Sequence, residues 1–178
     1  MASSGMIPAK SNHRQPPVGR SIDLLPLPIQ QFLTHTATKL IALHPYRYQE
    51  TVEHLLLQAA NFLTARQVAL IQLQGETAQR AFYARPTENS GNVSDEQQGC
   101  RWWLRNHVDR TTQIWQTKHV DVQPLSNRLE EDGIQWGVSV AIGTDGELVQ
   151  GLLRIEMAGG AEYAKTAVLL ANGLAEIF

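Results

Sequence analysis

The stretch from Ile134 to Met157 constrains the fold more than any other part of the chain. Its first half alternates bulky with small side chains: Trp136, Val138, Val140 and Ile142 against Gly137, Ser139 and Ala141. Its second half, from Val149 to Met157, alternates again. Between them lies Gly143-Thr144-Asp145-Gly146, and Asp-Gly tolerates the positive φ of a tight reversal. Because a period of two places successive side chains on opposite sheet faces, the stretch predicts a β-hairpin at the centre of an antiparallel sheet.

Three other segments repeat apolar residues at spacings of three and four, which predicts amphipathic helices over residues 29–43, 48–65 and 162–178. The last of them carries two apolar stripes, whereas a lone surface helix needs one. We therefore expect it to be covered on two sides, by the sheet and by something else. The preceding residues 24–28 (LLPLP) contain two prolines and are expected to be extended.

Residues 67–74 and 79–84 predict two further strands joined by a turn, and residues 112–117 predict a short one. Ser94 and Gln97 have the spacing of a capping box, which would open a short helix through Cys100 to Leu104. One helical turn is expected around residues 125–129. The predicted class is α+β, built on an antiparallel sheet as a single domain over residues 22–178.

Residues 1–21 are rich in Ser, Gly, Pro and basic side chains without periodicity, which predicts a disordered tail. Three of the 15 basic residues and none of the 17 acidic ones lie in residues 1–20, so the remainder is acidic. This balance argues against nucleic acid and anionic membranes as partners. No apolar stretch approaches the roughly 18 residues of a membrane span and no secretory leader is visible, so a cytoplasmic location is expected.

The hairpin AIGTDGELVQGLLRIEM, the closing helix KTAVLLANGLAEIF and the helix–strand join before VALIQLQG resemble the GAF domain, a ligand-binding and dimerising sensory module of signalling proteins. The resemblance covers about residues 30–178. It implies an antiparallel sheet with the N- and C-terminal helices on one face. On the other face it implies a short helix and loops over a pocket, in which members bind cyclic nucleotides, bilins, haem or small metabolites.

The residues themselves offer no catalytic constellation and no metal site. The six histidines form no HxH or HExxH pattern, and a single cysteine excludes an internal disulfide. Bilin-carrying members bond their chromophore through a cysteine just before the hairpin, where this chain has SNRLEEDG. Cys100 lies earlier and is followed by Arg101. We expect no cofactor and no enzymatic activity.

The four tryptophans are the candidate ligand contacts, because all fall on elements expected around the pocket. They could stack on a planar ligand, with an arginine meeting an anionic group; the alternative is that they fill the pocket themselves. The candidates are Trp102, Trp103, Trp115, Trp136, Arg101 and Arg128.

Two functions remain open from the sequence. The first is a regulatory module that homodimerises through its terminal helices, with Leu170 and Ile177 at the interface, and signals to a separate effector protein. Within one chain, the helix over residues 29–43 could instead cover these two side chains. The second is a sensor of a nucleotide or metabolite that uses the pocket.

Overall fold

The computed structural model describes residues 25–74, 77–84, 102–103, 112–123, 125–143 and 149–178. Five strands form one sheet: β1 (Gln67–Gln74), β2 (Thr77–Ala84), β3 (Gln113–Gln116), β4 (Trp136–Ile142) and β5 (Gly151–Met157). The longer helices are α1 (Leu27–Ile41), α2 (Tyr48–Leu63), α4 (Leu125–Glu131) and α5 (Ala164–Ile177). Short 3₁₀ turns are η2 (Pro45–Arg47), η3 (Thr117–His119) and η4 (Ala161–Tyr163).

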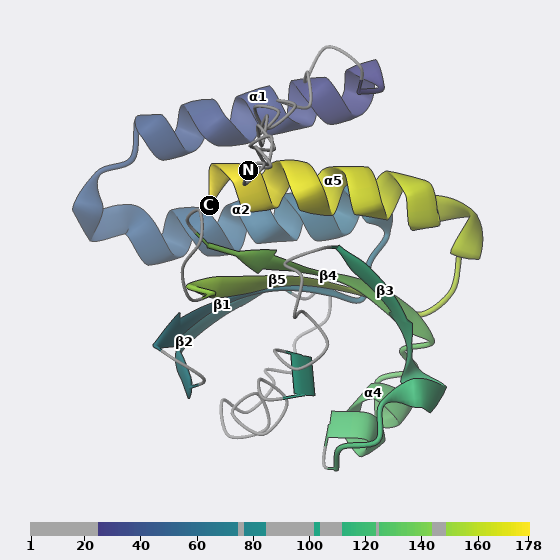
Figure 1. Cartoon of the computed structure of the whole chain (residues 1–178). Coiled ribbons are helices and arrows are strands. Elements are labelled where there is room, and N and C mark those ends of the chain that lie inside the picture. Colours follow the sequence, from purple (N-terminus) through teal and green to yellow (C-terminus); the bar gives the residue numbers. More distant parts are fainter. Residues whose placement is uncertain (1–24, 75–76, 85–101, 104–111, 124, 144–148) are drawn as a thin grey trace, which may run out of the picture.

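The sheet has the strand order β2-β1-β5-β4-β3, and every pair is antiparallel (Figure 1). The predicted hairpin is confirmed: β4 pairs with β5 from Trp136 opposite Met157 to Ile142 opposite Gly151. β5 also pairs with β1, from Gln67 opposite Glu156 to Gln72 opposite Gly151. The hairpin therefore lies inside the sheet, as the alternation of bulky and small residues required.

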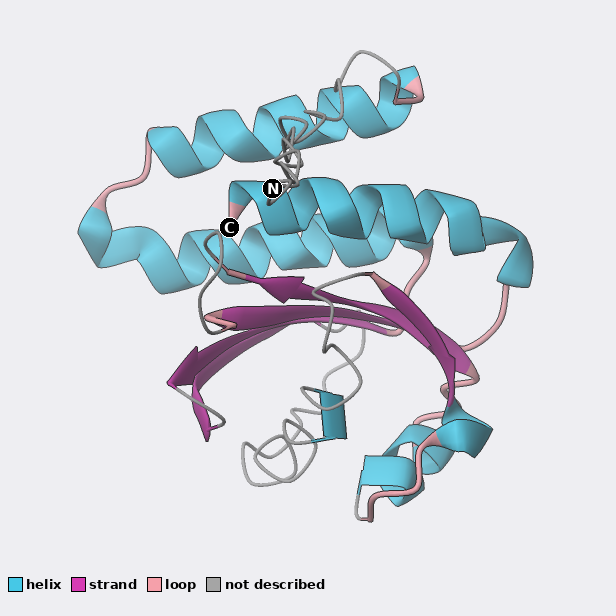
Figure 2. Cartoon of the chain, viewed as in Figure 1, coloured by secondary structure: helices cyan, strands magenta, loops and turns pink. Residues whose placement is uncertain are grey.

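Three helices, α1, α2 and α5, gather on one side of the sheet in two layers (Figure 2). α2 packs on β1 and β2, and α5 packs on β4 and β5, while α1 lies over α2 and α5 as an outer layer. α4 lies beyond the opposite side of the sheet (Figure 1). The α+β fold class, with terminal helices on one face and a short helix on the other, is confirmed.

The core between sheet and helices is built from apolar side chains. The sheet contributes alternate residues of four strands, all less than 8% exposed: Val68, Leu70, Phe82, Ala84, Trp136, Val138, Val140, Leu153, Ile155 and Met157. Removing one large aliphatic side chain from water contributes roughly 1.5–3 kcal/mol, so this layer supplies much of the stability.

α5 is covered on both sides, as its two stripes predicted. Leu170 is 0% exposed, and α1 packs over α5, with Leu33 directly against Gly173. The expectation that Leu170 lies at an interface between two chains is therefore corrected: its side chain is core within one chain. Ile177 is partly buried and packs on the same core.

Several boundaries differ from the predicted ones by one or two residues, among them the starts of α1 and β5. α1 begins at Leu27 and includes Pro28, although this segment was expected to be extended. The first turn of a helix has no intrahelical partner for its N–H groups, so a proline fits there. β5 begins at Gly151, and Gln150 lies outside it while donating its N–H to Ile142 O at 2.8 Å. The expected capping box at Ser94, Cys100 and the tail of residues 1–21 lie outside the described residues.

Candidate ligand-binding face

The face of the sheet turned away from the helices carries charged residues at its centre. On β5 the alternation that sends Leu153, Ile155 and Met157 toward the helices sends Leu152, Arg154 and Glu156 the other way. Arg154 and Glu156 are both 0% exposed. Burying an ionised side chain is costly unless it is paired and hydrogen-bonded, so these two residues require partners.

The partners come from α4 and from the strand itself. Arg128 reaches Glu156 with both terminal nitrogens, Nη2 to Oε1 at 2.8 Å and Nη1 to Oε2 at 3.3 Å. Arg154 Nε forms an ion pair with Glu156 Oε1 at 2.7 Å. Arg128 also donates to Asp132 Oδ2 at 3.4 Å, at the solvent side of the cluster. One buried carboxylate thus lies between two guanidinium groups, and it fastens α4 to the centre of the sheet.

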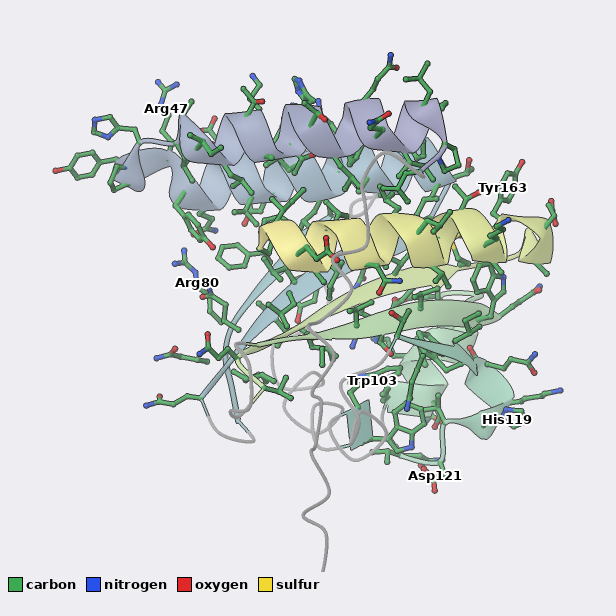
Figure 3. The ribbon with its side chains drawn as sticks, turned by 45° about the horizontal axis from the view of Figure 1, so that its top comes forward. Arg47, Arg80, Trp103, His119, Asp121 and Tyr163 are labelled. Atoms are coloured by element: carbon green, nitrogen blue, oxygen red, sulfur yellow. The ribbon has the colours of Figure 1, made fainter. Side chains whose placement is uncertain are left out.

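Tryptophans cover this ion cluster. Trp103 is 1% exposed, and its ring centroid lies 4.8 Å from that of Trp115 and 4.5 Å from that of Trp102. The guanidinium carbon of Arg154 lies 5.3 Å from the Trp103 ring, within the range of a cation–π contact. Figure 3 shows Trp103 on the side of the sheet opposite α5. These side chains occupy the face where the resemblance implied a pocket.

Gly137 makes room for this arrangement. A β carbon at position 137 would overlap the Trp115 indole and the Ile155 carbonyl oxygen. The small residues of the first hairpin arm therefore serve this face, with Ser139 also 0% exposed. Among the described residues, the indole N–H groups of Trp103 and Trp115 have no hydrogen-bond acceptor.

The six candidate ligand contacts do not all lie on the same face of the sheet. Trp102, Trp103 and Trp115 lie together on the expected face. Trp136 does not, which corrects the prediction: it belongs to the bulky set of β4, packs in the core under the helices and donates Nε1–H to Gly159 O at 3.0 Å. Arg128 already meets a carboxylate within the protein. Arg101 lies outside the described residues.

Sequence reasoning missed the most unusual residues of this face, Arg154 and Glu156. A signal was present, because both charges stand at alternate positions of a strand (GLLRIEM) that is otherwise apolar on both sides. A strand that is apolar on both faces is a buried one, so charges within it are buried too. Gln67, 2% exposed at the start of β1, was missed in the same way.

Two grooves lie elsewhere on the molecule. One, of about 550 Å³, lies between the end of α2 and the β5–α5 connection, from Leu63 to Tyr163. The other, of about 690 Å³, runs beside β3 and is lined by residues that include Ile114, Trp136 and Ala164. Neither is lined by the ion cluster or by Trp103.

Within the residues that the structure describes, no group of three or more His, Cys, Asp or Glu side chains could hold a metal ion. Among the same residues, no helix is both long enough and apolar enough to cross a bilayer. The acidic run Glu130-Glu131-Asp132 forms no acid–base pair, because the first two carboxylates are exposed and Asp132 pairs with Arg128.

Comparisons with known proteins agree with this architecture. No protein-family model and no curated protein matches the sequence. Among solved structures, the nlh2 GAF domain of A. aeolicus in an inactive state has a TM-score of 0.58 at 14% identity, covering 84% of this chain and 94% of its own. The phycocyanobilin-bound GAF domain of a cyanobacterial phytochrome has a TM-score of 0.53 at 12% identity, covering 85% and 94%.

The chromophore-binding domain of Stigmatella aurantiaca phytochrome P1 has a TM-score of 0.51 at 16% identity, covering 86% of this chain but 61% of its own. The helix layers, the strand order and these likenesses together show that the chain has the GAF-domain fold.

Proposed function

We propose that this chain is a non-enzymatic regulatory module that forms a homodimer through its outer helix α1 and passes a signal to a separate protein. The observation that carries the proposal is the outward face of α1. Five residues on it recur at spacings of four and three and are all exposed: Leu27, Gln31, Thr34, Thr38 and Ile41.

This set, which we call the α1 seam, has the spacing of the a and d positions of a coiled coil. It holds no charged residue, and Lys39 is the single charged residue of the helix. Its ends are apolar, since Leu27 is 63% exposed and Ile41 is 87% exposed. Phe62 of α2, which is 39% exposed and contacts Phe32, extends the apolar surface beside it. An uncharged helical seam on the outside of a domain fits a second copy of itself.

The seam replaces the interface expected from the sequence. Leu170 is 0% exposed within one chain and α1 packs over α5, so the closing helix reaches a partner only through the helix that lies over it. Ile177 is partly buried at the end of α5 and contributes at most a margin to such an interface. The terminal helices remain the proposed dimer surface, with α1 in the outer position.

The experiment places charges on the seam. Thr34→Glu combined with Ile41→Glu should convert a dimer into a monomer in sedimentation velocity while circular dichroism stays native, because carboxylates then face each other across the two-fold axis. Lys39→Glu is the matched control: it makes the same change in net charge on an exposed position outside the seam, and should leave the dimer intact. A parent protein that sediments as a monomer at every concentration would sink the proposal.

A second candidate function is a small-molecule sensor, and one observation favours it. Two guanidinium groups and three indoles meet on the face that, in the fold, lies under the short helix. One structural neighbour is described as phycocyanobilin-bound. Here the segment just before the hairpin, SNRLEEDG, holds no cysteine. Trp103 is already packed in place, so any ligand would have to be small and anionic or displace an indole.

A melting-temperature screen with nucleotides and carboxylate metabolites separates the two functions. A ligand at a hundredfold excess over its Kd stabilises the folded state by about 2.7 kcal/mol. A genuine ligand of this face should lose its effect in Arg154→Met and retain it in the α1 double variant. A screen without any shift leaves the regulatory dimer as the function.

A further inference from the structure

The two edges of the sheet are built differently. β2, at one edge, carries the exposed Arg80 in its middle, and its pairing with β1 shifts register between Gln72 and Leu73. A charge and a bulge are the usual ways of preventing another strand from adding to an edge. β3, at the other edge, has neither: residues 112–117 (TQIWQT) are uncharged, contain no proline and pair with β4 without a shift.

The open side of β3 presents backbone groups in a known order. Thr117 donates its N–H to Gln135 O at 3.0 Å, toward β4. The N–H and C=O groups of successive residues alternate sides along a strand. The backbone groups of Trp115 and Gln113 therefore also point toward β4, while those of Ile114 and Gln116 point away from the sheet. No described residue pairs with the N–H and C=O groups of Ile114 and Gln116.

A groove runs beside this edge. The Ile114 side chain lies on the helix side of the sheet, opposite Val138, and is 58% exposed. With Ile134, Trp136, Ala161 and Ala164 it forms an apolar floor in the groove of about 690 Å³. The volume falls within the range of roughly 300–1,000 Å³ that ligand sites occupy.

The rim of the groove carries one charge of each sign, since Lys118 and Glu130 both line it. The chain beyond residue 20 is acidic as a whole, so a second copy would bring charge of the same sign, whereas a basic segment would be attracted.

The length of the edge also favours a short segment over a second domain. Four residues of strand span only about 14 Å at the usual rise per residue, and a stable protein dimer buries about 800 Å² on each partner. A single extended peptide can pair with four residues and insert alternate side chains into the groove, as in the recognised mode of strand addition.

We propose that β3 is a docking edge for an extended peptide segment of a partner protein, with apolar side chains at alternate positions and a lysine or arginine at its flank. The segment pairs with the backbone of Ile114 and Gln116, lays its apolar side chains on the groove floor and places its cation by Glu130. This surface is separate from the α1 seam, and the inference stands whether or not the seam forms a dimer.

The test uses a defined probe, the capped peptide Lys-Thr-Val-Thr-Ile-Thr-Val-Lys, added to the full chain labelled with ¹⁵N. The amide resonances of Ile114 and Gln116 should move, and their hydrogen exchange should slow by at least roughly tenfold at saturation, since these N–H groups gain acceptors. The matched control peptide has the same sequence with N-methyl groups on alternate residues, which removes its pairing donors. It should leave both amides unchanged.

The protein offers a second matched pair. Ile114→Pro removes an N–H that points away from the sheet, and proline is tolerated on edge strands in that position, so the fold should persist while binding falls by at least about tenfold. Ile114→Val keeps the N–H and most of the apolar contact and should bind like the parent. If Ile114→Pro fails to fold, the two peptides decide the question alone.

Three results would overturn the inference. The probe leaves Ile114 and Gln116 unchanged; the N-methylated peptide acts as well as the probe; or the two amides are protected without peptide and in proportion to protein concentration, which would assign the edge to a second copy. A fourth arm tests the charge: replacing the flanking lysines of the probe by glutamates should weaken binding by roughly tenfold in low salt, and an equal affinity would refute the contact between the flanking cation and Glu130.

Discussion

On β5, Leu153, Ile155 and Met157 face the helices while Leu152, Arg154 and Glu156 face the other way, and all six side chains are buried. The first side is a continuous apolar layer closed by α2 and α5. The second side combines apolar residues with an ion cluster, two buried tryptophans and the buried Ser139 and Gln67. One strand therefore belongs to two cores with different chemistry.

The difference predicts different responses to mutation. An apolar core tolerates a change of shape at the cost of lost contacts, and its terms are roughly additive over separate sites. A buried polar cluster is stable only when each member is satisfied, because the remaining partner of a removed group stays desolvated. Substitutions on the helix side should lower the free energy of unfolding in small, roughly additive steps. On the other side, removing a single member of the ion cluster should lower it sharply.

The largest effect is expected for Glu156→Ala. It removes the carboxylate between Arg128 and Arg154, and so takes the Glu156 carboxylate from a guanidinium that is 0% exposed. Breaking a buried ion pair on one side costs about 3–5 kcal/mol. Urea unfolding followed by circular dichroism should show a loss of that size.

The control replaces both charges. Arg154→Met combined with Glu156→Met fills similar volume without a charge at either position, and replacing a buried pair in this way is often neutral. The double variant should therefore be more stable than Glu156→Ala. The two faces do not differ in their response to mutation if Glu156→Ala costs less than about 1 kcal/mol, or if the double variant is less stable than Glu156→Ala.

A smaller effect is expected for Gly137→Ala on the same face. The added methyl group meets the Trp115 indole on one side and the Ile155 carbonyl oxygen on the other. Overpacking of this kind costs typically 1–3 kcal/mol, and the free energy of unfolding should fall by that amount.

The same substitution made in a Trp115→Leu background tests the cause. Removing the indole frees one side of the methyl group, but the backbone oxygen remains, so the increment for Gly137→Ala should stay unfavourable. A methyl group that becomes neutral in this background would show that the indole alone sets the limit.

Much of this architecture follows from sequence periodicity. The alternation along residues 134–157 located the two inner strands, and the spacing of apolar residues located α1, α2 and α5, because each pattern reports one local period. Periodicity also showed that α5 has two buried sides. It did not show that α1 supplies the second cover, since that requires the relative positions of helices more than 100 residues apart in sequence.

The candidate site was predicted less well, for a related reason. Alternation tells which residues of β4 share a face, but not which face carries the pocket, and Trp136 was assigned to the wrong one. The pairing of Arg128 with Glu156 joins residues 28 positions apart through the docking of α4. A local pattern contains no information on that docking, although the two charges inside β5 indicated that partners had to exist.

The smallest effect is expected for Gly173→Ala, on the helix side. Gly173 lies in α5, where an added β carbon would overlap the side chain of Leu33 from α1. The overlapping atoms belong to the flexible side chain of Leu33 rather than to the backbone, so they can shift. Overpacking of this kind typically costs about 1–3 kcal/mol. Alanine also gains about 1 kcal/mol over glycine in a helix interior, which offsets part of this cost. The net change in unfolding free energy should stay within about 1 kcal/mol of the parent.

In a Leu33→Ala background the overlap is gone and only the helix preference remains, so Gly173→Ala should stabilise that background by about 1 kcal/mol. If it destabilises both backgrounds, as Gly137→Ala is expected to do, the helix side is as intolerant of a methyl group as the ion-cluster side.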